Sequence, residues 1–194
     1  MTSEPMPFLW LCGASGVGKS SVGFEIFCQV RADGLKAAYV DFDQIGFCRP
    51  APDDDPNNHR IKAQNLAVMW ANFRSAGAQC LVASGIVESD KAIRMHSDAM
   101  ADTALTVCRL RAGDEQLRQR IFLRGRGGGP AIPGDELKGK SLEWLAAAAD
   151  DSIREAAEME RDGIGDLCAD TDSRSVEEVA RLVRVLAGDW PRLV

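Results

Sequence analysis

Residues suited to binding phosphate lie together near the start of the chain. Residues 13–20 read Gly-Ala-Ser-Gly-Val-Gly-Lys-Ser, which matches the spacing G-x-x-x-x-G-K-S. Glycines let successive backbone N–H groups point at a phosphate, helped by the positive end of a following helix. Lys19 can neutralise the β- and γ-phosphates of ATP or GTP, and Ser20 can hold Mg²⁺. The residues predicted to bind the nucleotide here are Gly13, Ala14, Ser15, Gly16, Val17, Gly18, Lys19, Ser20 and Ser21.

Two carboxylates follow the next apolar run. Asp41 and Asp43 are separated by Phe42. Alternate residues of a strand point the same way, so both carboxylates can face the crevice beyond the carboxyl end of the strand. One can hold Mg²⁺ through its water shell, and the other can accept a proton from an attacking hydroxyl. The alternative is that both residues only cap a helix and shape a loop.

Arginines gather in one part of this otherwise acidic chain. Six lie within 18 residues, namely Arg109, Arg111, Arg118, Arg120, Arg124 and Arg126. A transferring phosphoryl group spreads negative charge over its oxygens, and an arginine beside a glycine-rich segment can close over it. Arg124 and Arg126 border such a segment, at residues 125–140, whose composition predicts a mobile lid. The alternative for about half of the cluster is a solvated helix face.

These residues need a sheet that brings them to one edge. Apolar runs predict strands at residues 8–12, 36–42, 79–83, 104–110 and 167–170. Helical spacing predicts helices at residues 19–31, 59–76, 90–100, 114–123, 141–161 and 176–186. We expect Asp114 to cap the fourth helix. The alternation predicts an α/β fold with a parallel sheet and helices on both faces, as one domain over residues 1–194.

Composition excludes several classes of protein. A net charge of −6 disfavours binding to nucleic acid, which needs uncompensated basic residues. The six cysteines show no Cys-x-x-Cys pair and are expected to be buried thiols of a cytoplasmic protein. Since no apolar run approaches the roughly 20 residues that span a bilayer, we expect no membrane association and no signal peptide. His59 is expected to cap a helix, and His96 to lie on the surface.

Four motifs occur in an order that resembles the small-molecule kinases of the P-loop superfamily, which include shikimate, gluconate and adenylylsulfate kinases and chloramphenicol phosphotransferase. They are the loop at 13–20, Asp41-x-Asp43, Leu117-x-x-Arg120-x-x-x-Arg124 and Asp170-Thr171-Asp172. The resemblance covers nearly the whole chain, although only the phosphate loop is specific by itself. It implies a three-layer P-loop NTPase fold, a five-stranded parallel sheet of order 2-3-1-4-5, and a glycine-rich lid.

The resemblance also implies roles for individual residues. Asp41 would support Mg²⁺, and Asp43 would contact the acceptor hydroxyl as the catalytic base. The lid arginines that close over the phosphates would be Arg120 with Arg124 or Arg126. An adenine contact would come from the turn after the last strand, at Thr171 and Arg174.

The acceptor side of the site has weaker signals. The third predicted strand continues as Ser-Gly-Ile-Val-Glu88 and lacks the aspartate found there in many P-loop ATPases and nucleoside monophosphate kinases. This resembles the shikimate-kinase type, in which Gly85 would let an acceptor approach, and a tight structural turn is the equal alternative. Ligands of open α/β sheets bind beyond the strand ends, so Arg49, Arg60, Glu88 and Arg94 are candidates for acceptor recognition. Each is otherwise surface charge.

The sequence therefore predicts an ATP- and Mg²⁺-dependent kinase that phosphorylates a hydroxyl of a small molecule. Its predicted catalytic residues are Lys19, Asp43, Arg120 and Arg124, and its predicted acceptor-binding residues are Asp43, Arg49, Arg60 and Gly85. The lack of an Asn-Lys-x-Asp guanine motif favours ATP over GTP. Two alternatives stay open: a nucleoside monophosphate kinase, and a regulatory nucleotide-binding protein without an acceptor. We expect a monomer or a homodimer.

Overall fold

Five parallel strands form the centre of the molecule, in the order β2-β3-β1-β4-β5. The computed structural model describes residues 4–129 and 135–192. The strands are β1 (Met6–Cys12), β2 (Ala37–Asp41), β3 (Cys80–Ser84), β4 (Thr103–Arg111) and β5 (Leu167–Asp170). The predicted strand order 2-3-1-4-5 is confirmed.

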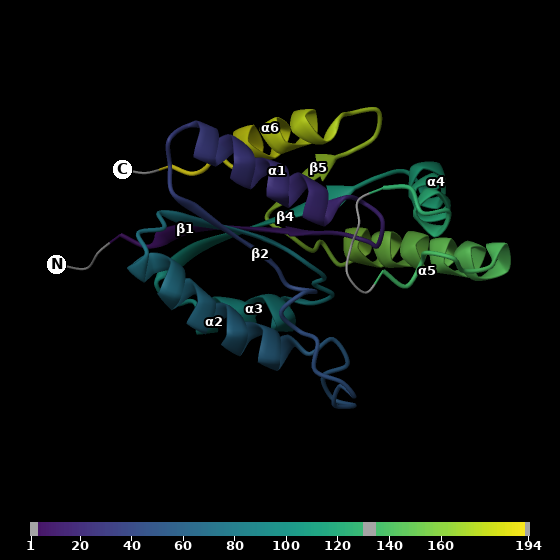
Figure 1. The fold of residues 1–194 in the computed structure, drawn as a ribbon, viewed down its shortest axis with the longest axis horizontal. Coiled ribbons are helices and arrows are strands. Elements are labelled where there is room, and N and C mark those ends of the chain that lie inside the picture. The colour runs from purple at the N-terminus through teal and green to yellow at the C-terminus, as the bar shows by residue number, and fades with distance from the viewer. Residues whose placement is uncertain (1–3, 130–134, 193–194) are drawn as a thin grey trace.

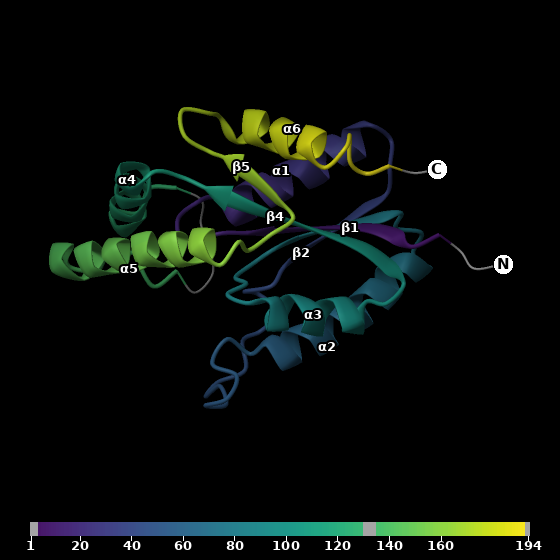
Figure 2. The same cartoon turned by 180° about the vertical axis from the view of Figure 1, so that it is seen from behind.

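Helices cover both faces of the sheet and one of its ends (Figure 1). They are α1 (Lys19–Ala32), α2 (His59–Ser75), α3 (Asp90–Ala99), α4 (Asp114–Gly125), α5 (Leu142–Arg161) and α6 (Val176–Leu186). One face of the sheet carries α1 with α6, and the other carries α2 with α3. Helices α4 and α5 pack together beyond one end of the sheet (Figure 2). The three-layer α/β architecture is thereby confirmed.

The central strand β1 divides the core into two layers. Residues 8–12 of this strand are fully buried, as expected for an apolar strand with helices on both sides. Because side chains alternate along a strand, Phe8 and Trp10 face the α2 and α3 layer, and Leu9 and Leu11 face the α1 and α6 layer. Strand β1, which leads into the phosphate loop, therefore contributes to the core on both faces of the sheet.

Strand register brings the polar ends of three strands together. Leu11 of β1 pairs with Ser84 of β3, and Ser84 pairs with Asp41 of β2. All of these pairs lie at the carboxyl ends of parallel strands. The register therefore places the Asp41 backbone two strands away from the start of the 13–20 loop, at the same edge of the sheet.

Some predictions of local structure need correction. Asp114 does not cap α4: it is the first helical residue, Gly113 precedes it, and the Gly113 N–H donates to Asp172 Oδ2 at 2.9 Å. Burial of all six cysteines is also wrong, because Cys48 lies in an exposed loop and Cys168 on β5, a strand at the sheet edge. Residues 130–134 of the expected lid fall outside the described residues, and the mobility of 125–140 stays a prediction.

None of the helices that the structure describes is both long enough and apolar enough to cross a membrane.

Candidate active site

The 13–20 loop connects β1 directly to the first turn of α1. Gly13, Gly16 and Gly18 have φ angles of 137°, 79° and 106°, which residues other than glycine rarely adopt. At Gly13 there is also no space, since a Cβ would lie 2.5 Å from the Leu110 carbonyl oxygen. The strand, loop and helix predicted from the sequence are all present. The loop backbone is thus shaped by its glycines and abuts the positive end of a helix.

Lys19 arches back over this loop. Its Nζ donates hydrogen bonds to the carbonyl oxygens of Gly13 at 2.8 Å and of Ala14 at 3.0 Å. The ammonium therefore lies beside the loop backbone, within a cavity of about 450 Å³. Residues from the loop, the end of β2, α4 and the turn after β5 line this cavity, so it collects most of the predicted nucleotide-binding residues.

A chain of hydrogen bonds fixes Asp41 beside the start of α1. Ser20 Oγ donates to Asp41 Oδ2 at 2.6 Å, and Ser84 Oγ donates to the same oxygen at 3.2 Å. Tyr39 shares a 2.8 Å hydrogen bond with Ser84, and burial raises the pKa of Tyr39 to about 12. Ser20 and Asp41, the two residues predicted to bind the metal, are therefore in direct contact, with the serine hydroxyl beside the carboxylate.

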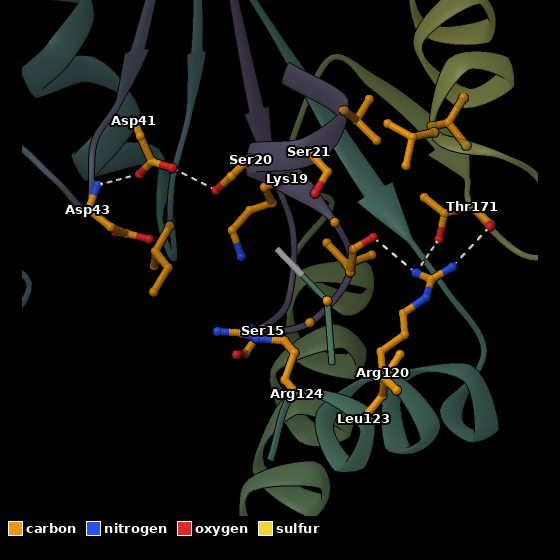
Figure 3. A pocket seen from close by; sticks show the side chains of 18 of the residues that line it. Ser15, Lys19, Ser20, Ser21, Asp41, Asp43, Arg120, Leu123, Arg124 and Thr171 are labelled. Carbon is orange, nitrogen blue, oxygen red and sulfur yellow. Dashed lines mark hydrogen bonds between the residues drawn. The ribbon is translucent and has the colours of Figure 1, made fainter. Parts of the chain in front are cut away.

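Asp43 lies on the same side of Lys19 as Asp41 (Figure 3). Its backbone N–H donates to Asp41 Oδ1 at 3.0 Å, and its half-exposed carboxylate lies 3.4 Å from Lys62 Nζ. Arg120 lies on the opposite side of Lys19, as Figure 3 shows. The cavity thus has a carboxylate side and an arginine side, with the lysine between them.

Arg120 is held in place by three hydrogen bonds. Its Nη1 donates to the Val17 carbonyl at 3.0 Å and to Thr171 Oγ1 at 2.9 Å, and its Nη2 donates to the Thr171 carbonyl at 3.1 Å. It therefore ties α4 to the phosphate loop and to the turn after β5. Arg120 and Thr171, predicted separately as a phosphate contact and an adenine contact, are thus hydrogen-bonded to each other, and both roles stay predictions.

The other two predicted lid arginines differ from each other. Arg124 lines the cavity and pairs with Asp135, with Nη2 and Oδ1 2.9 Å apart. Arg126 is exposed and is outside the set of described residues that line the cavity. Closure of either arginine over a phosphate stays a prediction.

Apolar side chains surround the predicted adenine contacts. Thr171 and Arg174 line the cavity together with Leu123, Val176 and Val179. The first two of these residues were predicted from the sequence, whereas the three apolar ones were not, because they lie at ordinary positions of predicted helices. Apolar side chains beside a threonine and an arginine suit a nucleotide base.

Helix α5 contacts the tip of the phosphate loop. The Ser15 N–H donates to Glu155 Oε2 at 3.1 Å, and Ser152 Oγ donates to the Ser15 carbonyl at 2.7 Å. Ser152 and Glu155 are three residues apart and share a helix face. Neither residue was predicted from the sequence, since no local signal identifies a partner about 140 positions away.

The arginines predicted to bind the acceptor contact their own loop instead. Arg60 donates to both carboxylate oxygens of Asp54 at 2.7 Å, and Arg49 donates to the Pro56 carbonyl at 3.1 Å. Both side chains thereby brace the segment between β2 and α2. Neither is among the described residues that line the cavity, and their role in acceptor binding stays a prediction.

Gly85 has a packing reason for being glycine. A Cβ there would lie 2.6 Å from the Cβ of Phe42, and the Gly85 carbonyl accepts a 3.4 Å hydrogen bond from Trp10 Nε1. These contacts support the alternative of a tight structural turn. The neighbouring Ile86 lines the cavity, and an acceptor contact at Gly85 stays a prediction.

Both histidines are buried, and neither has its predicted role. His59 does not cap α2, because Asn58 precedes the helix, and His59 Nε2 lies 2.9 Å from both carboxylate oxygens of Glu88. His96 is fully buried and stacks on Phe42 with ring centroids 4.9 Å apart. The predicted surface position of His96 is therefore wrong, because α3 turns this residue toward the aromatic side chains of Trp10 and Phe42.

Burial and hydrogen bonding shift the pKa values of this group. Burial lowers the pKa of His96 to about 4, and the nearby Lys62 ammonium acts in the same direction. Burial alone would raise the pKa of Glu88, but hydrogen bonds from His59 and Asn57 outweigh it and lower that pKa to about 2. His96 is therefore neutral and Glu88 ionised at neutral pH.

Comparisons of sequence and structure give different results. No family model matches the chain, and no curated protein matches it in sequence. In structure it is similar to a gluconokinase from Sinorhizobium meliloti 1021, with 16% identity, a TM-score of 0.58, and coverage of 96% of this chain and 97% of that one.

Two further structures support the same fold. The Deinococcus radiodurans tunicamycin resistance protein has 16% identity and a TM-score of 0.61, over 94% of this chain and 96% of that one. The Mycobacterium tuberculosis APS kinase, in complex with AMPPNP and APS, has 18% identity and a TM-score of 0.55, over 95% and 98%. At such identities the likeness shows that this chain has the α/β fold of the P-loop small-molecule kinases.

Proposed function

From the fold that this chain shares with P-loop small-molecule kinases, we propose that it transfers the γ-phosphoryl group of ATP to a hydroxyl of a small molecule, with Mg²⁺ as cofactor. The observation that carries the proposal is the contact of Ser20 with Asp41 beside Lys19, with Asp43 next to them. Phosphoryl transfer needs a phosphate cradle, a metal site and a group that orients the nucleophile. Each has a candidate in this one cavity.

Ser20 and Asp41 fit Mg²⁺ in their chemistry. Hydroxyl and carboxylate oxygens are the ligands that this hard cation prefers, usually with several waters kept. Ser20 Oγ and Asp41 Oδ2 are 2.6 Å apart, close enough to serve one ion directly or through its waters. Mg²⁺ bound there would neutralise negative charge on the phosphates.

The nucleotide would lie between the phosphate loop and the apolar pocket near Thr171. The loop N–H groups and the Lys19 ammonium would hold the phosphates, and the base would lie against Leu123, Val176 and Val179. Arg120 already contacts both the loop and Thr171, so it would be in place to stabilise charge on the phosphates.

Asp43 would act on the acceptor. Its carboxylate would accept the proton of the acceptor hydroxyl as the hydroxyl oxygen bonds to the γ-phosphorus. The bond from that phosphorus to the bridging oxygen breaks in the same displacement, and its electron pair leaves with ADP. The half-exposed position of Asp43 supports this role, because a small molecule can reach it from solvent.

The test is an ADP-release assay with Mg-ATP and a panel of candidate acceptors. The panel contains sugars, sugar acids, polyols, shikimate-like acids, nucleosides, nucleotides and antibiotics. For the acceptor that responds, Asp43→Asn should lower turnover by about 10²- to 10⁴-fold, the usual contribution of a general base. The matched control is Asp53→Asn, a change of an exposed aspartate in the loop that follows β2.

Other outcomes favour the two alternatives. Wild-type turnover of Asp43→Asn with a nucleoside monophosphate as acceptor would indicate a nucleoside monophosphate kinase, whose acceptor is already ionised. ATP binding without Lys19-dependent ADP release on any acceptor would indicate a regulatory nucleotide-binding protein.

A further inference from the structure

Lys62 is a charged residue on the buried face of α2. Helix α2 buries Lys62, Leu66 and Trp70, which are spaced four residues apart and so lie on one helix face. Only 8% of the Lys62 side chain is exposed. Burying an ammonium group costs free energy unless it is paired. A buried lysine on this helix face therefore calls for a reason beyond packing.

The neighbouring loop is shaped around the stem of this lysine. A Cβ at Gly46 would lie 2.4 Å from Lys62 Cε and 2.8 Å from Lys62 Cγ. Gly46 is not among the glycines with positive φ, so its backbone conformation does not demand glycine. The absence of a side chain at Gly46 thus leaves the space through which the Lys62 stem passes.

Two asparagines fix the loop in that place. Asn58 Nδ2 donates to the carbonyls of Gly46 at 3.0 Å and of Cys48 at 2.7 Å, and Asn65 Nδ2 donates to the Ile45 carbonyl at 2.8 Å. Asn58 is itself buried. The wall that confines the lysine is therefore held to helix α2, the helix that carries it.

The ammonium at the end of this passage meets Asp43. Lys62 Nζ lies 3.4 Å from Asp43 Oδ1, and among the described residues Asp43 is its ion-pair partner. This pairing engages one carboxylate oxygen of Asp43 and leaves Oδ2 for another contact. Asp43 is 43% exposed, so without a partner its side chain would be free to rotate in solvent.

We propose that Lys62 is a positioning residue, which holds the carboxylate of Asp43 in the orientation that receives the acceptor hydroxyl. The inference rests on the proposed function, in which Asp43 is the base. Lys62 acts through Asp43 and does not itself touch the reacting atoms. Because a misplacement of about 1 Å can cost about 10²-fold in rate, a buried lysine that fixes one base has a measurable effect.

The test compares Lys62→Met and Lys62→Gln with the wild type, with Lys91→Met at an exposed position of α3 as control. The reaction is ADP release with the acceptor found in the panel, or with water as the acceptor in slow ATP hydrolysis if the panel finds none. We expect kcat to fall by about 10²-fold, while the Kd of Mg-ATP stays within about twofold. The Tm should stay unchanged or rise, because methionine completes the apolar row.

A double variant separates positioning from a structural role. If Lys62 acts through Asp43, the variant that combines Lys62→Met with Asp43→Asn is no slower than Asp43→Asn alone. Losses that multiply, or a wild-type kcat for both Lys62 variants, would overturn the inference. A fall in Tm together with a weaker Kd for Mg-ATP would also overturn it, since this is the pattern of a lysine that only holds the loop.

Crystal structures distinguish failure of this inference from failure of the proposed function. In Lys62→Met we expect the Asp43 side chain to occupy more than one rotamer while its backbone stays in place. An unchanged Asp43 side chain would refute the positioning role. If Asp43→Asn keeps full turnover, the proposed function fails by itself, and the Asp43 rotamer in these crystals still decides whether Lys62 orients it.

Discussion

The proposed nucleotide side and the proposed acceptor side of the cavity differ in the parts of the chain that shape them. On the proposed nucleotide side the phosphate loop is shaped by its backbone, because Gly13, Gly16 and Gly18 turn the loop and α1 begins directly behind it. On the acceptor side the geometry depends on side chains, with Lys62 of α2 reaching Asp43 past Gly46. A contiguous sequence specifies the first arrangement, whereas the second exists only after the chain has folded.

The two sides also differ in what lies beneath them. Below the phosphate loop, β1 and α1 pack Leu11, Val22 and Ile26 into an apolar cluster. Below Asp43, the layer formed by α2 and α3 buries His59 and His96 among its aromatic side chains. The core below the phosphate loop, which is shaped by its backbone, is thus apolar. The core below Asp43, which is positioned by side chains, contains titratable groups.

The largest expected effect tests whether the nucleotide side is indispensable. Lys19→Ala removes the one lysine of the phosphate loop, and we expect turnover to fall by about 10³-fold because charge on the transferring phosphoryl group is no longer neutralised. The measurement is ADP release at saturating acceptor. Far-UV circular dichroism and Tm should match those of the wild type, since Lys19 bonds only to loop carbonyls.

Lys91→Ala on α3 serves as the charge-matched control, and it should retain wild-type turnover. If Lys19→Ala retained more than about a tenth of the activity, the loop would not be the phosphate cradle and the comparison between the two sides would fail.

The same contrast explains what could be predicted from the sequence. The loop at 13–20 and the ends of most helices and strands were predictable, because their signals are local: glycine spacing, apolar periodicity and turn residues. The strand order followed from a resemblance. Lys62 was missed because an isolated lysine in a helix normally indicates solvent. His96 was misplaced because its neighbours Trp10 and Phe42 are distant in sequence.

An intermediate effect concerns the buried histidine below the acceptor side. His96 has a pKa of about 4 in the folded protein, against 6.5 as the ordinary value. Between these pH values the unfolded chain binds more protons, so the free energy of unfolding decreases as the pH falls from 6.5 to 4. Integrated over that window the loss is at most about 3 kcal/mol.

His96→Phe should remove this dependence and keep the stacking on Phe42. Urea unfolding at pH 7, 5.5 and 4.5 measures it: the wild type should lose stability on acidification, and the variant should lose little. The acid loss that belongs to Glu88, whose pKa is lowered to about 2, lies below pH 4.5 and should persist in both proteins. Equal pH profiles of the two proteins between pH 7 and 4.5 would show that the pKa of His96 is the same in the folded and the unfolded protein, and would contradict the prediction.

The smallest expected effect tests the contact of the Glu155 carboxylate with the phosphate loop. Glu155 accepts a hydrogen bond from the Ser15 N–H and places a negative charge at the loop where we expect phosphates. Glu155→Gln keeps an oxygen acceptor and removes the charge. We therefore expect Mg-ATP to bind more tightly, by less than about tenfold, with a gain that shrinks at high salt.

Titration calorimetry at two ionic strengths measures this change, with Glu158→Gln, an exposed residue of the same helix, as the control. Weaker binding by Glu155→Gln would mean that the carboxylate supports the loop more than it repels the nucleotide. The nucleotide side would then depend on a side chain from α5, as the acceptor side depends on one from α2. Tighter binding would leave the glycines and the backbone N–H groups as the main determinants of affinity, with Glu155 as a charge that the phosphates must overcome.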